Sequence, residues 1–143
     1  MKKIFLLLLS ILFSSLSIGS TDVPPELFIF ESVGIQSYDP LIRAIFIHES
    51  GGNQFAINQS EMAVGPGQVR QCRVDHYNNL MGTSYQLEDF FSYELTEEMF
   101  VYFTCHDGNG NEIEPKSYEM AARGWNGSGP MTIEYWNKVK TLL

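Results

Sequence analysis

The stretch DPLIRAIFIHESGG, residues 39–52, decides the fold of this chain. Asp39 and Pro40 are typical of a helix start, because Asp is a good N-cap and proline suits the first helical turn. The apolar residues that follow face almost every side of such a helix, which indicates a central helix buried in a core. Gly51-Gly52 then forms a strong stop signal.

The segments around this helix predict one mainly α domain with a small β excursion. Residues 53–67, NQFAINQSEMAVGPG, are polar and rich in glycine, which favours turns or a small β-hairpin. Further helices are expected where apolar residues recur at helical spacing. These helices are 68–80, a short turn at 87–91, 97–104 with Thr96 as N-cap, 116–125, and a last one after Pro130 that carries Tyr135 and Trp136.

Residues 1–19 have the pattern of a signal peptide. A short positive start with Lys2 and Lys3 precedes the apolar residues 4–13, and small residues follow. This apolar run is shorter than the roughly 20 residues that cross a bilayer. We expect cleavage, a periplasmic or secreted location with no membrane span afterwards, an extended segment over residues 20–38, and a monomeric domain over residues 39–143.

Composition excludes several classes of protein. Apolar residues make up 44% of the chain, which argues against disorder. The formal net charge is −8 and no basic run offsets it, so the surface would repel phosphate backbones. We therefore expect no nucleic-acid partner.

The two cysteines, Cys72 and Cys105, form a candidate disulfide in an exported protein. A bridge would close a loop of about 34 residues and stabilise the fold by roughly 3–4 kcal/mol. Two buried free thiols are the alternative. Two cysteines are too few for a four-thiolate zinc site, and Gly52 stands where His48-Glu49 would need a second histidine to bind zinc. We expect neither a metal nor a cofactor.

Glu49 is the main candidate for chemistry. It follows Ile42, Ile45 and Phe46 on one helix face, so its carboxyl would lie against apolar side chains near the negative end of the helix dipole. Both effects raise the pKa of a carboxyl and keep it protonated near neutral pH, as a general acid requires. The alternative is an exposed glutamate on the last helical turn.

Two motifs carry a family resemblance. HESGGNQFAINQSEMAVGPGQV, residues 48–69, resembles the signature of the soluble lytic transglycosylase family of the lysozyme-like superfamily. In that signature a catalytic Glu-Ser is followed by an Ala, a Ser and a G-x-x-Q element. AARGWNGSGPMTIEYWNKV, residues 121–139, is similar to the family element A-x-x-Y-N-x-G with its later Tyr. The matching residues are Glu49, Ser50, Ala56, Ser60, Ala63, Gly65, Gln68, Asn126 and Tyr135, and Trp125 stands where Tyr is usual.

The resemblance implies a lysozyme-like α-helical domain that binds peptidoglycan glycan strands. It implies cleavage of the β-1,4 bond between N-acetylmuramic acid and N-acetylglucosamine, with Glu49 as general acid and base. Gln68 would lie on the floor of the cleft and Asn126 would orient the sugar or the catalytic carboxyl. The resemblance also implies that Ser60, Trp125 and Tyr135 bind substrate. In the alternative interpretation, Ser60 is a turn residue and the two aromatics are core residues.

Two alternatives stay open. Ordinary glycosidases use two carboxylates, and Glu61 is the acidic residue of the hairpin-like segment, so it could serve a lysozyme-type hydrolase as the second one. Pro66-Gly67 replaces the usual Leu-Met or Leu-Gln pair of the family, which fits a glycan-binding cell-wall protein with weak or no activity.

Overall fold

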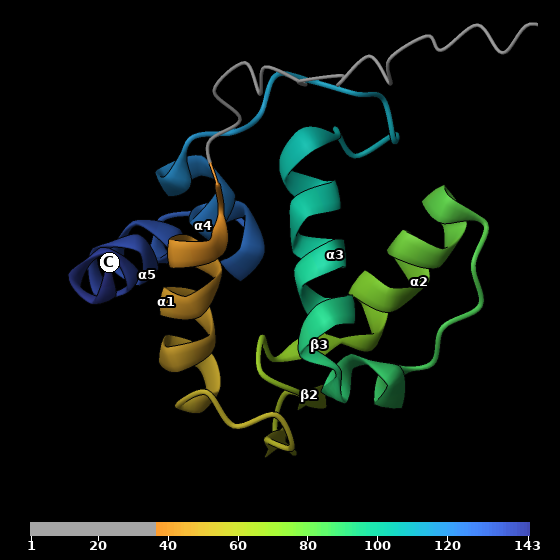
Figure 1. The fold of residues 1–143 in the computed structure, drawn as a ribbon, viewed down its shortest axis with the longest axis horizontal. Helices are drawn as coiled ribbons and strands as arrows, with labels where there is room; N and C mark the ends of the chain where they lie inside the picture. Colours follow the sequence, from red (N-terminus) through yellow and green to blue (C-terminus); the bar gives the residue numbers. More distant parts are fainter. Residues whose placement is uncertain (1–36) are drawn as a thin grey trace, which may run out of the picture. The chain divides into compact units, whose positions relative to one another are not determined.

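The computed structural model describes residues 37–143, which contain five α-helices, two short 3-10 helices and a three-stranded antiparallel sheet (Figure 1). The expectation of a mainly α domain with a small β excursion is therefore confirmed. The predicted signal peptide and almost all of the predicted extended segment lie outside the described residues. The elements are α1 (Asp39–Ser50), β1 (Ile57–Asn58), β2 (Ala63–Val64), β3 (Val69–Arg70), α2 (Gln71–Met81), η1 (Leu87–Phe91), α3 (Tyr93–Cys105), α4 (Tyr118–Asn126), α5 (Met131–Val139) and η2 (Lys140–Leu142).

Helix α1 is the central element that the sequence predicts. Pro40 lies in its first turn, while Tyr38 rather than Asp39 occupies the N-cap position. Gly51 ends the helix with a left-handed φ of 66°, which glycine adopts without strain. The N–H of Gly51 donates to the Ile47 carbonyl at 2.9 Å, and the N–H of Gly52 donates to the Phe46 carbonyl at 3.0 Å. These bonds fix the last turn of α1, which carries Glu49.

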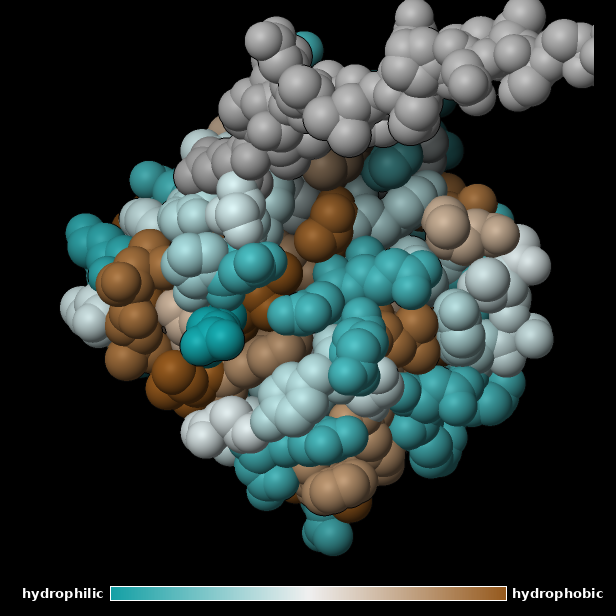
Figure 2. Space-filling view, in the orientation of Figure 1, coloured by the Kyte–Doolittle hydropathy of each residue, from teal (hydrophilic) through white to brown (hydrophobic). Residues whose placement is uncertain are grey.

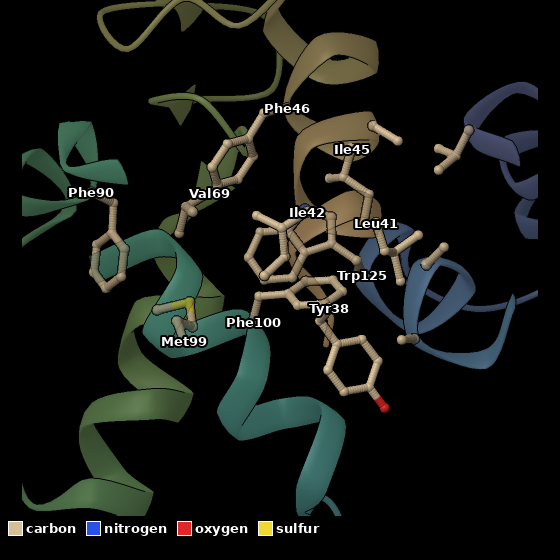
Figure 3. Close-up of a cluster of buried hydrophobic side chains, with 14 of the residues drawn as sticks. Tyr38, Leu41, Ile42, Ile45, Phe46, Val69, Phe90, Met99, Phe100 and Trp125 are labelled. Atoms are coloured by element: carbon tan, nitrogen blue, oxygen red, sulfur yellow. The ribbon is translucent and has the colours of Figure 1, made fainter. Parts of the chain in front are cut away.

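The core forms around α1. Helices α4 and α5 lie beside it, and α3 stands between α1 and α2 (Figure 1). Figure 3 shows side chains of α1 meeting Phe100 of α3 and Trp125 of α4 in one cluster. Each fully buried large apolar side chain contributes roughly 1.5–3 kcal/mol to stability. The buried residues of α1 are Leu41, Ile42, Ala44, Ile45 and Phe46.

The sheet begins in the predicted hairpin segment and continues past it. Strands β1, β2 and β3 pair in that order, so the excursion extends to Arg70. The turn from β2 to β3 is buried and crosses η1 closely: a Cβ added to Gly65 would lie 1.9 Å from the Phe90 carbonyl oxygen. Only glycine fits at this point, so the turn is packed rather than loose.

Helix starts differ most from the sequence predictions. Helix α2 starts at Gln71 rather than 68, because Val69 and Arg70 pair with β2. Helix α3 starts at Tyr93 rather than 97: Ser92 caps it by accepting the Leu95 N–H at 3.1 Å. Thr96, predicted as the cap, is buried inside this helix.

The cysteines are free thiols in the structure, so the disulfide proposed from the sequence is not formed in it. Cys72 is exposed on the first turn of α2 and lines the cavities described below, whereas Cys105 is partly buried at the end of α3 and lines neither of them.

The surface is mostly hydrophilic on the face shown in Figure 2, with hydrophobic residues gathered on the side where α5 lies. Among residues 37–143, no helix has the length and apolarity needed to cross a membrane.

Candidate functional site

A cavity of about 380 Å³ opens at the end of α1. Its walls come from α1, the sheet and its turns, the start of α2, the end of α4, and α5. The volume falls within the roughly 300–1,000 Å³ of small-molecule sites. The residues that line it are His48, Glu49, Asn58, Glu61, Gln68, Arg70, Cys72, Arg73, Trp125, Asn126, Gly127 and Tyr135.

Glu49 lies on the last turn of α1 and is half-buried. The hydroxyl of Tyr135 donates a hydrogen bond to Glu49 Oε1 at 2.8 Å. Burial raises the pKa of the Glu49 carboxyl, while the Tyr135 bond and the charges of Arg70 and Arg73 act in the opposite direction. The net shift is upward. The carboxyl can therefore hold a proton at a higher pH than an exposed glutamate.

Tyr135 is a buried partner for this carboxyl, with 6% of its surface exposed. Burial and the negative charge of Glu49 raise the pKa of the phenol, so Tyr135 stays a neutral donor. The imidazole of His48 meets the Tyr135 ring edge-on, with centroids 5.0 Å apart. Burial lowers the pKa of His48, which favours the neutral imidazole beside the phenol.

Two hydrogen bonds attach the β2–β3 turn to the helices. Ser50 Oγ lies 2.9 Å from the Pro66 carbonyl oxygen, to which it can donate, and Trp125 Nε1 donates to the Gly67 carbonyl at 3.0 Å. Gln68 follows with a left-handed φ of 50°, and its side-chain Nε2 donates to the Gly65 carbonyl at 3.0 Å. This uncommon backbone conformation occurs where the turn places Gln68 in the wall of the cavity.

Five of the six residues predicted for catalysis or substrate binding line this cavity: Glu49, Gln68, Trp125, Asn126 and Tyr135. Ser60 does not: it is exposed in the β1–β2 turn and donates to Asn58 Oδ1 at 2.7 Å, as a local turn residue would. Trp125 is only 5% exposed, so most of its ring belongs to the core and only part borders the cavity. Asn126 is exposed at the end of α4.

Glu61 also lines the cavity, so a second carboxylate is present beside Glu49. Its side chain forms an ion pair with Arg70 across the sheet, and both partners are about half exposed. Its charge contributes to the raised pKa of Glu49.

Arg73 is the residue that sequence reasoning missed. Its guanidinium donates to the Trp125 carbonyl at 2.6 Å, and its Cζ atom lies 4.4 Å from the centroid of the Trp125 ring. Burial lowers the pKa of Arg73, but an arginine in this environment stays charged at neutral pH. A charged residue on a short helix normally indicates a solvent-facing position. Only its contact with Trp125 of α4 reveals that Arg73 is partly buried.

No three His, Cys, Asp or Glu side chains within residues 37–143 come close enough together to hold a metal ion. The half-buried carboxyl, its phenol partner and the amides around them form a site suited to proton transfer. Comparisons of the chain with protein-family models, curated proteins and solved structures gave no match.

Proposed function

We propose that this chain is a lytic transglycosylase that cleaves peptidoglycan glycan strands, with Glu49 as its general acid and base. The main support for this proposal is the Glu49 carboxyl. It is half-buried, accepts a hydrogen bond from the Tyr135 hydroxyl at 2.8 Å and lines a cavity with Gln68 and Asn126. The family resemblance assigns the reaction to the same residues. The bond cut would be the β-1,4 link between N-acetylmuramic acid and N-acetylglucosamine.

One carboxyl is sufficient for such a reaction. Protonated Glu49 delivers its proton to the glycosidic oxygen as the bond from that oxygen to C1 breaks. The carboxylate left behind takes the proton of the muramic acid C6 hydroxyl, whose oxygen attacks C1 and closes a 1,6-anhydro ring. Glu49 ends protonated, and no water is consumed. The nucleophile is tethered to the reacting sugar and so gains the advantage of a high effective concentration.

The surroundings of Glu49 suit both of its protonation states. Burial raises the pKa of the carboxyl, which keeps a proton available for the first step. The Tyr135 hydroxyl supports the carboxylate that forms afterwards, because a hydrogen bond to the charged form stabilises it. Peptidoglycan lies outside the cytoplasmic membrane, so the proposal also requires the export that residues 1–19 predict. We propose that the protein acts there as a monomer.

Glu61 supports a second candidate function, hydrolysis of the same bond. It lines the cavity with Glu49, and a two-carboxylate glycosidase needs such a partner as base or nucleophile. Its ion pair with Arg70 restrains this carboxylate, which favours the single-carboxylate route.

Digestion of purified cell wall tests these functions, with products identified by mass. We expect the native protein to release fragments without a reducing end, about 18 Da lighter than hydrolysed ones because no water is added. Glu49→Gln keeps the size of the side chain but has no proton to deliver, so activity should fall by about 10²–10⁴-fold or more. Glu88→Gln is the control, because Glu88 is exposed and lines neither cavity.

The other outcomes separate the alternatives. Reducing-end sugars, together with a comparable loss of activity in Glu61→Gln, would replace the proposal with hydrolysis. Full activity of Glu49→Gln would reject the site. Wall binding without any released product would favour the glycan-binding alternative.

A further inference from the structure

A second cavity, of about 350 Å³, adjoins the first. It lies among α2, α3, α4 and the segment that follows α3. Cys72, Arg73 and Trp125 line both cavities, so the two share a wall. Arg73 therefore borders both cavities.

The second cavity gathers positive charge in an acidic protein. Arg73 and Lys116 line it, together with His76 and His106, while the chain as a whole has a net charge of −8. Within residues 37–143, neither Arg73 nor Lys116 forms an ion pair; the pairs there use Arg70, Arg123 and Lys138. Arg43 and Lys140, the other basic residues of this range outside ion pairs, are exposed to solvent.

Asp107 is the one acidic residue of this lining, so with Arg73 and Lys116 present the lining keeps a net positive charge. Asp107 turns its carboxylate into its own loop, where both oxygens accept hydrogen bonds from Asn111 and one also accepts the N–H of Asn109. Lys116 donates to the backbone carbonyls of Phe103 and His106. These carbonyls are neutral, so the ammonium charge is not cancelled.

Arg73 has capacity for a ligand. A guanidinium carries five N–H donors, and the structure uses Arg73 for one side-chain bond, to the Trp125 carbonyl. Arg73 is partly buried and forms no ion pair, although the Glu49 carboxylate is near enough to act on its charge. A partly buried charge that lacks a direct ion-pair partner is costly to a fold, and an anion that binds beside it lowers this cost. Arginine pairs with a carboxylate through two parallel hydrogen bonds, which makes a carboxylate a well-matched ligand.

We propose that the second cavity binds a carboxylate of the peptide stem attached to the muramic acid unit held beside Glu49. This inference rests on the proposed function. The stem is carried by the same sugar whose bond Glu49 would break, and Arg73 also lines the cavity in which that sugar would lie. Peptide stems bear free carboxylates, and Arg73 with Lys116 supplies the charge to recognise one. The preferred substrate is then stem-bearing peptidoglycan rather than bare glycan.

Calorimetry with the full chain carrying Glu49→Gln tests the site without turnover. The probes are a free stem peptide and the same peptide with every carboxylate converted to an amide. We expect the acidic peptide to bind and the amidated one to bind about 10- to 100-fold more weakly, as the loss of a charge-assisted hydrogen bond implies. Adding Arg73→Gln should weaken binding of the acidic peptide by a similar factor. Arg43→Gln is the matched control and should leave it unchanged.

Three results would overturn the inference: equal binding of the two peptides, equal loss in the Arg43→Gln control, or inorganic phosphate that displaces the peptide at a similar concentration. The last would mark a site for any small anion. Circular dichroism checks the fold of each variant. If Arg73→Gln does not fold, Lys116→Gln decides, because Lys116 lines only the second cavity.

Activity assays on native protein separate this inference from the proposed function. Equal rates on stem-bearing and stem-free glycan strands would reject the peptide site and leave the transglycosylase proposal intact. Arg73-dependent peptide binding without cleavage of any wall material would reject the transglycosylase proposal and leave the carboxylate site.

Discussion

At the scale of single residues, the Glu49 carboxyl is subject to opposing effects. Burial favours its protonated form, whereas the Tyr135 hydroxyl and two nearby arginines favour the carboxylate. Burial is the largest of these effects, so the pKa in the folded protein lies above the ordinary value of 4.5. The folded state therefore binds the proton more tightly than the unfolded chain does.

This shift predicts how the stability of the protein depends on pH. A raised folded pKa contributes stability that is fully present below about pH 4 and is lost as the pH rises through the folded pKa. Glu49→Gln removes the ionising group but keeps an acceptor for Tyr135. We expect the variant to melt near the wild-type temperature at pH 4 and above it at pH 8, as measured by calorimetry at both pH values.

Glu88→Gln is the control for this comparison, because Glu88 is exposed and should show no gain that grows with pH. A Glu49→Gln variant that is less stable than wild type at pH 8 would show that the carboxylate stabilises the fold, contrary to the pKa direction.

At the scale of elements, the site depends on the turn that joins β2 to β3. A Cβ added to Gly67 would lie 2.8 Å from Thr96 Cγ2, 3.0 Å from Trp125 Cζ2 and 3.2 Å from Phe46 Cε1. These atoms belong to three different helices. The turn therefore fills the space between them, and its position fixes that of Gln68.

Gly67→Ala should destabilise the protein by about 1–3 kcal/mol, as overpacking of a core does, and should lower activity because the turn carries Gln68. Gly124→Ala provides the contrast. Nothing lies within 4 Å of a Cβ at Gly124, which is inside α4, so alanine there should be neutral or stabilise by up to about 1 kcal/mol. Urea denaturation measures both changes, and equal effects would contradict the packing argument.

The elements also show what the sequence could and could not predict. Residues 39–52 specify α1 locally, through a proline at the start, a nearly continuous apolar run and two glycines at the end, and the helix forms as expected. The start of α3 was predicted wrongly because Ser92 and Thr96 both precede acidic residues. Packing separates them: the Thr96 hydroxyl is buried against the Phe90 and Ser92 carbonyls, and Ser92 is left as the cap.

The site follows the same rule. Glu49 and Gln68 lie in one continuous motif, and Asn126 with Tyr135 lies in a second, so the family resemblance of the two motifs was enough to predict a common cavity. The environment of Arg73 depends on Trp125, which is 52 residues away in the chain. No local pattern encodes a contact of that kind.

At the scale of the whole molecule, Tyr38 ties the start of the described chain to its second half. Its hydroxyl donates to the Lys116 carbonyl, and its ring lies 6.1 Å from that of Phe100 and 5.8 Å from that of Tyr118, measured between centroids. In return, the Tyr118 hydroxyl donates to the Ser37 carbonyl at 2.6 Å. Tyr38 is 5% exposed, so it belongs to the core.

Tyr38→Ala should therefore cost about 3–5 kcal/mol of unfolding free energy, as the loss of a large buried aromatic does. Tyr38→Phe keeps the ring and loses one hydrogen bond, so it should cost only about 1 kcal/mol. Chemical denaturation of both variants measures the difference. If Tyr38→Ala matched Tyr38→Phe, the ring would not be part of the cooperative core.

The hydrogen bonds at the C-terminal end of α1 affect how freely this part of the molecule moves. Helix ends fray, and a reactive group on a fraying turn must lose conformational entropy each time it engages a ligand. Here Gly51 and Gly52 bond back to the helix, and Ser50 reaches the β2–β3 turn. Unwinding the last turn of α1, which carries Glu49, would break the bonds within the helix and the bond to the β2–β3 turn at the same time. The entropy of ordering the carboxyl is therefore lost when the chain folds, and an incoming ligand meets an acid that is already in place.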